Sequence, residues 1–127
     1  MRWLLLLLLL PACSTEEVSD KRLYAGSGKD RLCIDGDRVG FIVHAAGGAN
    51  CSVRGRLDQT GAAVAIIPAG DQECRIAAER LGDRFRLGPL TRACAYYCGP
   101  GADFSGQVFE AAPGASPAVD FAGDPLC

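Results

Sequence analysis

The chain is 127 residues long, with 13 basic and 15 acidic side chains and a net charge of −2 at neutral pH. This length suits a single domain. The mildly acidic balance argues against nucleic acid as the principal partner, because phosphate binding requires concentrated positive charge. Seven cysteines in so short a chain indicate a disulfide-rich, exported domain.

The first residues contain the three parts of a secretory signal. Arg2 supplies positive charge, residues 4–10 form a run of leucines, and small residues follow Pro11. A membrane-spanning helix needs roughly 20 apolar residues, so this run is too short to be one. The segment therefore directs export and does not itself span a membrane.

The end of this signal, Leu10-Pro11-Ala12-Cys13, resembles the lipobox of bacterial lipoproteins. Pro11 departs from the small or β-branched residue usual at its position. The resemblance implies that residues 1–12 are a removed signal peptide and that Cys13 is acylated, which anchors the protein to a membrane of a Gram-negative cell envelope. Ser14 implies the outer membrane, facing the periplasm. The alternative is an ordinary secretory signal that releases a soluble protein.

Residues 13–30 are a polar stretch, which we expect to be a flexible tether, and the residue pattern of the chain changes after it. Residues 31–112 are expected to form the domain. Short runs of alternating apolar and polar residues, separated by Gly, Asp and Pro, predict strands at residues 31–34, 37–44, 50–57, 62–67, 73–78 and 84–87. The expected fold is therefore mainly β, an antiparallel meander of about six strands, either a curled sheet or a small barrel.

The C-terminal third differs in composition. Residues 89–98 predict one short helix, which the glycines and proline of "GPG" end, and a further short turn is expected in residues 103–111. The tail, residues 113–127, is rich in Pro and Gly and is expected to be irregular and tied down by Cys127.

Period-two alternation assigns the strand residues to two faces. The apolar face is predicted to contain Val39, Phe41, Val43, Cys51, Val53, Leu57, Cys74, Ile76, Phe85 and Leu87. The other face is predicted to contain Arg38, Arg54, Arg56, Arg75, Arg84 and Arg86. These arginines are a candidate surface for an anionic partner such as a cell-wall polymer; the alternative is an ordinary solvated sheet face.

Six cysteines remain when Cys13 is set aside, an even number that is typical of a disulfide framework: Cys33, Cys51, Cys74, Cys94, Cys98 and Cys127. Cys51 and Cys74 lie on strands separated by a third, roughly 9–10 Å apart and beyond disulfide reach. A helix across that face offers Cys94 to one and Cys98 to the other, and Cys33 then pairs with Cys127. Which of the two meets which is left open.

A soft-metal site is the alternative for two of these cysteines. On a helix, Cys94 and Cys98 lie one turn apart, about 5–6 Å between Cβ atoms, and with His44 they suit an ion such as Cu(I). Copper-delivery proteins of the cell envelope combine such a C-x-x-x-C element with a distant His. Their thioredoxin-like order of elements is not found in this sequence. Structural disulfides are therefore the favoured interpretation, and we expect no cofactor.

The sequence contains neither G-x-S-x-G nor H-E-x-x-H, and its single His has no obvious nucleophile partner, so we expect no enzymatic activity. A tethered lipoprotein with a small antiparallel β-domain resembles the lysozyme-inhibitor lipoproteins in architecture. The Ser- and Lys-bearing inhibitory loop of that family is not found. The expected function is a non-catalytic binding or inhibitor-like module in the periplasm, with an envelope protein or cell-wall polymer as partner.

Overall fold

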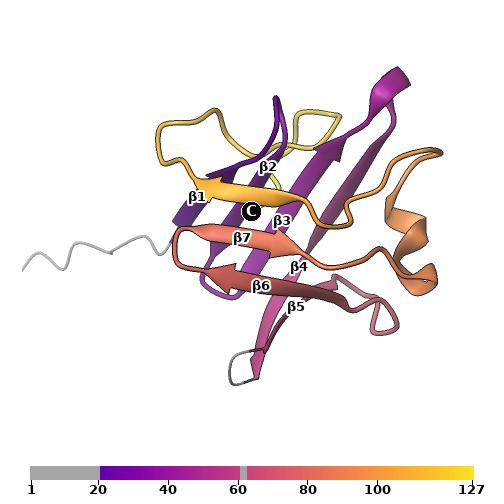
Figure 1. Ribbon diagram of the computed structural model, residues 1–127, viewed down its shortest axis with the longest axis horizontal. Coiled ribbons are helices and arrows are strands. Elements are labelled where there is room, and N and C mark those ends of the chain that lie inside the picture. The colour runs from indigo at the N-terminus through magenta and orange to yellow at the C-terminus, as the bar shows by residue number, and fades with distance from the viewer. Residues whose placement is uncertain (1–20, 61–62) are drawn as a thin grey trace, which may run out of the picture.

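The protein is an eight-stranded antiparallel barrel in a computed structural model that describes residues 21–60 and 63–127. Each strand pairs with the next along the chain, and β8 pairs with β1 to close the cylinder (Figure 1). The expected signal peptide, the acylation site Cys13 and the first part of the expected tether lie outside the described residues. No helix in those two ranges is long and apolar enough to span a membrane.

The strands are short, and tight connections join most of them. They are β1 (Lys21–Ala25), β2 (Arg31–Asp35), β3 (Arg38–His44), β4 (Asn50–Thr60), β5 (Ala63–Pro68), β6 (Ile76–Leu81), β7 (Arg84–Leu87) and β8 (Val108–Ala111). Two 3₁₀ turns, η1 (Ala46–Gly48) and η2 (Arg92–Tyr97), lie in the connections. A mainly β, antiparallel, disulfide-bridged fold is therefore confirmed, in the barrel form of the two forms expected.

The predicted number of strands is wrong, because two strands lack the alternating pattern on which the prediction was based. β1 lies in the expected tether, and β8 lies where only a turn was expected. Each has one fully buried inward side chain, Tyr24 in β1 and Phe109 in β8. Both strands are short, and their apolar residues are adjacent (Leu23 and Tyr24, Val108 and Phe109) and do not alternate with polar ones, so no period of two is visible. These two strands nevertheless pair with each other and close the barrel. The domain consequently includes residues 21–30.

The predicted helix over residues 89–98 is also wrong. Only the 3₁₀ turn η2 forms, and Cys98 after it is extended, with φ −114° and ψ 133°. Disulfides account for this geometry. Cys94 bonds to Cys74 and Cys98 bonds to Cys51. The positions of these two partners, which lie on different elements, determine the path of the segment, and this path is not α-helical.

The barrel interior is a packed apolar core. The predicted inward residues are all buried except Leu57, which is partly buried. Rings from five positions fill the centre: Tyr24, Phe41, Phe85, Phe104 and Phe109. Phe104 comes from the long connection between β7 and β8, and its ring centroid lies 5.4 Å from that of Phe41. The connection therefore covers one end of the barrel with an aromatic side chain.

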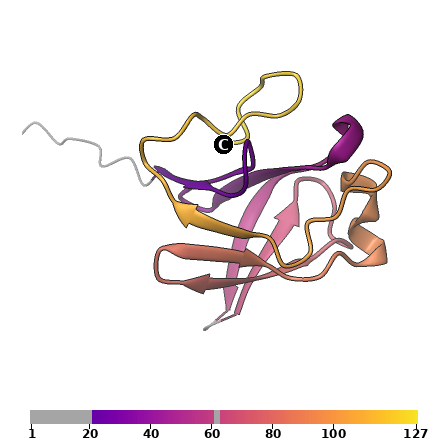
Figure 2. The same ribbon diagram turned by 45° about the horizontal axis from the view of Figure 1, so that its top comes forward.

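The C-terminal segment, residues 112–127, forms a second layer that we call the strap. It crosses the outside of the barrel above β1, β2 and β3 (Figure 2). Ala118 and Leu126 pack on Cys33 and Ile42, which point out of the barrel, and Cys127 bonds to Cys33. The strap is irregular and tied by Cys127, as the sequence predicts, but it is also packed on the barrel at Ala118 and Leu126.

Candidate binding site

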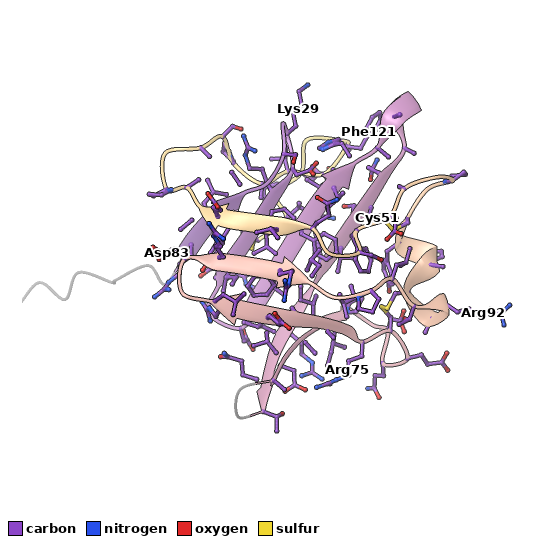
Figure 3. All side chains as sticks on the ribbon, in the orientation of Figure 1. Lys29, Cys51, Arg75, Asp83, Arg92 and Phe121 are labelled. Carbon is purple, nitrogen blue, oxygen red and sulfur yellow. A yellow bond between two sulfur atoms is a disulfide. The ribbon has the colours of Figure 1, made fainter. Side chains whose placement is uncertain are left out.

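The two ends of the barrel differ in construction. β1 starts at one end, beside the β2–β3 and β6–β7 turns. The other end carries the β1–β2, β3–β4, β5–β6 and β7–β8 connections, and we call it the disulfide-held end. Figure 3 labels Asp83 at the first end and Arg92 at the second. Any segment that precedes Lys21 therefore joins the barrel away from the disulfide-held end.

Two disulfides fix the β7–β8 connection at this end. Cys94 lies within η2 and bonds to Cys74, just before β6, while Cys98 follows η2 and bonds to Cys51 in β4. All but Cys98 are buried, and Cys98 packs against the same core. Disulfides typically contribute about 2–4 kcal/mol each, so the turn between them is held firmly against the barrel.

The turn between the bridges presents two adjacent tyrosines. Tyr96 is 89% exposed, whereas Tyr97 is partly buried against the core. Their rings are perpendicular, with centroids 5.3 Å apart, so the edge-to-face contact supports the exposed ring.

A hydrogen-bond network connects Tyr97 to the neighbouring β5–β6 connection. The Tyr97 hydroxyl donates to Asp71 Oδ2 at 2.8 Å, and Asp71 Oδ1 accepts from the backbone N–H groups of Glu73 and Cys74. The tyrosine hydrogen bond, with the backbone donors, lowers the pKa of Asp71. Burial and the bond to Asp71 raise the pKa of Tyr97 to about 12. At neutral pH both groups are in the protonation state that the bond requires.

A second polar contact at this end joins β3 to the β1–β2 connection. Asp30 is 5% exposed and accepts from the backbone N–H of His44 at 2.8 Å, with His44 Nδ1 at 3.0 Å from the same oxygen. His44 is exposed, but it has a buried partner. Asp30 was expected in the flexible tether, so sequence reasoning missed this pair.

The six predicted surface arginines are all exposed, but barrel closure spreads them around the cylinder. Five have acidic partners: Arg38 with Asp35, Arg54 with Asp120, Arg75 with Asp58, Arg84 with Glu110 and Arg86 with Glu79. Arg56 makes no ion pair with any other described residue. The structure therefore brings together Arg38, Arg54 and Arg56 on β3 and β4, and separates Arg75, Arg84 and Arg86 from them.

The alternative metal site is not assembled. Cys94 and Cys98 are both in disulfides and offer no thiolate, and His44 contacts Asp30. Within residues 21–60 and 63–127, no group of three or more His, Cys, Asp or Glu side chains is placed to hold a metal ion.

Comparisons with protein-family models, curated proteins and solved structures find no match to this chain. The functional argument accordingly rests on the geometry of the barrel and of its disulfide-held end.

One missed contact had a readable signal in the sequence. Asp71 follows Gly70 and precedes three polar or small positions, the pattern in which an Asp side chain accepts from backbone N–H groups two and three residues ahead. The bond from Tyr97 had no such signal, because it joins residues 26 apart in sequence.

Proposed function

We propose that the protein is a non-catalytic binding module of a bacterial cell envelope, anchored through acylated Cys13, whose disulfide-held end contacts a protein partner. One observation carries this proposal: an 89% exposed tyrosine on a turn that two disulfides hold against the barrel. A tyrosine offers a large amphipathic surface, and fixing it before binding reduces the entropy lost on association.

The filled interior of the barrel supports binding through its outer surface. Side chains from all around the cylinder fill the centre, and Phe104 covers the disulfide-held end. A ligand site of the kind that barrels enclose needs an empty lumen, so contact through the connections is the better use of this fold. The described start of β1 lies at the opposite end, which would direct Tyr96 away from an anchored N-terminus.

Site-specific crosslinking in living cells tests the contact. A photoreactive phenylalanine analogue at position 96 should give a discrete adduct, while the same group at position 121 should not. Phe121 is a matched control because it is 83% exposed and lies in the strap. Adducts at both positions, or at neither, would contradict the proposal.

The partner recovered from that adduct then permits a quantitative test. Tyr96→Ala should weaken binding of the purified partner by about 30-fold or more, which corresponds to the roughly 2 kcal/mol of an interface hot spot. Phe121→Ala should leave the affinity within about twofold, as a residue outside the contact does. Equal affinities for the two variants would rule out Tyr96 as the anchor.

Two further measurements address the anchor and the inhibitor-like role. The intact mass of protein from the membrane fraction should show loss of residues 1–12 and added acyl mass on Cys13. For inhibition, the clearing rate of a bacterial suspension by purified lysozyme should fall when the protein is added, and Tyr96→Ala should restore it. An unchanged clearing rate would exclude lysozyme as the partner while leaving the crosslinking test decisive for the module itself.

A further inference from the structure

The pairing register places two arginines directly opposite each other. Arg38 on β3 faces Arg56 on β4, and both side chains point out of the barrel. Directly opposed side chains in an antiparallel pair have Cβ atoms about 4.5–5.5 Å apart, where like charges destabilise the sheet. This arrangement is therefore unfavourable unless an anion occupies the space between the two guanidinium groups.

The rest of the described barrel avoids such an arrangement. Its other directly opposed charged pairs all join opposite signs: Lys21 with Asp35, Asp35 with Arg38, Glu79 with Arg86 and Arg84 with Glu110. The Arg38–Arg56 pair is the exception among the strand residues that the structure describes. Opposite-charge pairing thus accounts for the placement of Arg84 and Arg86 but not for the Arg38–Arg56 pair.

Neighbouring acids compensate the pair only weakly. Asp35 Oδ2 lies 3.5 Å from an Arg38 nitrogen, and Asp35 also faces Lys21 across the β1–β2 ladder. Arg56 has no acidic partner among the described residues. The Asp35 carboxylate is therefore shared between Lys21 and Arg38. The charge of Arg56 remains uncompensated.

Arg38 and Arg56 both line a groove of about 680 Å³ on the outside of the barrel. Its walls include Ile67 and Pro68 from β5 and Leu126 from the strap, so much of the lining is apolar. The volume falls in the range of about 300–1,000 Å³ that is usual for small-molecule sites. The groove thus combines two cationic groups with an apolar wall. The side-chain carboxylate in its lining, Asp71, already accepts hydrogen bonds from Tyr97 and from two backbone N–H groups.

Arg54 borders the same groove but has a structural role. It donates to Asp120 Oδ2 at 2.7 Å and to the carbonyl oxygen of Pro125 at 3.0 Å, which holds the strap in place. The backbone N–H of Asp124 and the guanidinium of Arg54 lower the pKa of Asp120. The strap wall is therefore formed before any ligand binds.

We propose that this groove binds a small amphiphilic anion, whose carboxylate or phosphate group lies between Arg38 and Arg56 and whose aliphatic body lies against Ile67, Pro68 and Leu126. Guanidinium groups match the geometry of carboxylates and phosphates through paired hydrogen bonds. The site goes beyond the binding module proposed above, because it takes a different ligand class in a groove that Tyr96 does not line.

Isothermal titration of the oxidised full-length protein with octyl phosphate and with octanoate tests the site. Both should bind, and inorganic phosphate or neutral octanol should bind at least about tenfold more weakly, because each lacks one of the two interactions. If inorganic phosphate binds as tightly as octyl phosphate, the ligand is a free anion and the apolar wall has no role. If neither amphiphile binds, the proposal is wrong.

Matched variants assign the binding to the pair. Arg38→Gln and Arg56→Gln should each weaken octyl phosphate binding by about tenfold or more, the loss expected for a hydrogen bond to a charged group. Arg84→Gln and Arg86→Gln should leave it within about twofold, because their guanidinium groups face glutamates elsewhere on the barrel. Tyr96→Ala should have no effect, which separates this site from the disulfide-held end. An equal loss in both arginine sets would show only a general charge effect.

Thermal unfolding without ligand provides a second, independent test. At low salt, Arg56→Gln should unfold at the same or a higher temperature than the wild type, since it removes a like-charge contact. Arg86→Gln should unfold at a lower temperature, since it removes an opposed ion pair. High salt should reduce both differences. A lower unfolding temperature for Arg56→Gln than for Arg86→Gln would show that Arg56 stabilises the fold, and would overturn the proposal.

Discussion

A single methyl group at Gly40 should lift the strap from the barrel. Gly40 in β3 is buried beneath Leu126, and a Cβ built at Gly40 would lie 2.7 Å from the Leu126 Cβ and 3.0 Å from its carbonyl carbon. Carbon atoms in contact are ordinarily about 3.5–4.0 Å apart. In Gly40→Ala, the strap must therefore move outward by about 1 Å at this point.

The cost follows from what the strap covers. Leu126 is 3% exposed and Ile42 is 2% exposed, and fully exposing one such side chain costs about 1.5–3 kcal/mol. Replacing glycine by alanine in a strand by itself stabilises the fold by roughly 0.5–1 kcal/mol, which offsets part of this cost. We therefore expect Gly40→Ala to lower the free energy of unfolding by about 1–3 kcal/mol, and the midpoint temperature by about 5–15 °C for a domain of this size.

The assay is thermal unfolding followed by circular dichroism, on protein whose mass confirms three intact disulfides. Gly114→Ala is the matched control, because Gly114 lies in the same strap, has no positive φ and has no atom within 4 Å of a built Cβ. That variant should change stability by no more than about 1 kcal/mol, in the stabilising direction. Equal midpoints for the two variants would refute the packing argument.

Three further changes probe other contacts. Tyr97→Phe should remove the phenol whose pKa is raised to about 12; because that pKa lies above the ordinary 10.0, wild-type stability should fall between pH 10 and 12 and the variant's fall should be smaller. Equal losses of stability in the two proteins between pH 10 and 12, measured by urea unfolding, would contradict this. Asp30→Ala should cost about 1–3 kcal/mol in urea unfolding by leaving the His44 N–H without its acceptor, and Asp30→Asn should cost less. Cys33→Ala with Cys127→Ala opens a bridge with a sequence separation of 94 and should cost about 4–5 kcal/mol; a loss below about 1 kcal/mol would show that packing alone holds the strap.

The barrel core was predictable from local pattern alone. Alternation placed Val39, Phe41 and Val43 on one face of β3, and these side chains do point into the barrel. That inference works because the side-chain period of a strand is fixed at two and one face must be buried. The same faces predicted that Cys51 and Cys74 would each bond to a cysteine of a third element, because strands that are not neighbours cannot bridge directly. They did not determine which of them bonds to Cys94 and which to Cys98.

Long-range packing accounts for what the pattern missed. β1 and β8 are short and their apolar residues do not alternate with polar ones. They form strands because they pair with each other at the closure of the barrel, a contact between segments far apart in the sequence. The surface arginines were predicted on one face because alternation distinguishes only the inner from the outer side of a sheet, and barrel closure distributes the outer side around a cylinder. Register decides the rest: only the pairing of β3 with β4 reveals that Arg38 and Arg56 are opposed.

The three disulfides are nested, one within another. Cys74–Cys94 lies inside Cys51–Cys98, which lies inside Cys33–Cys127, with sequence separations of 20, 47 and 94. Only the innermost bridge joins cysteines that are consecutive in the described chain. Oxidation in order of emergence would join Cys33 to Cys51, and this bond would have to be exchanged before either outer bridge could form. Under that order of oxidation, maturation of this domain would depend on thiol–disulfide isomerisation and not on oxidation alone.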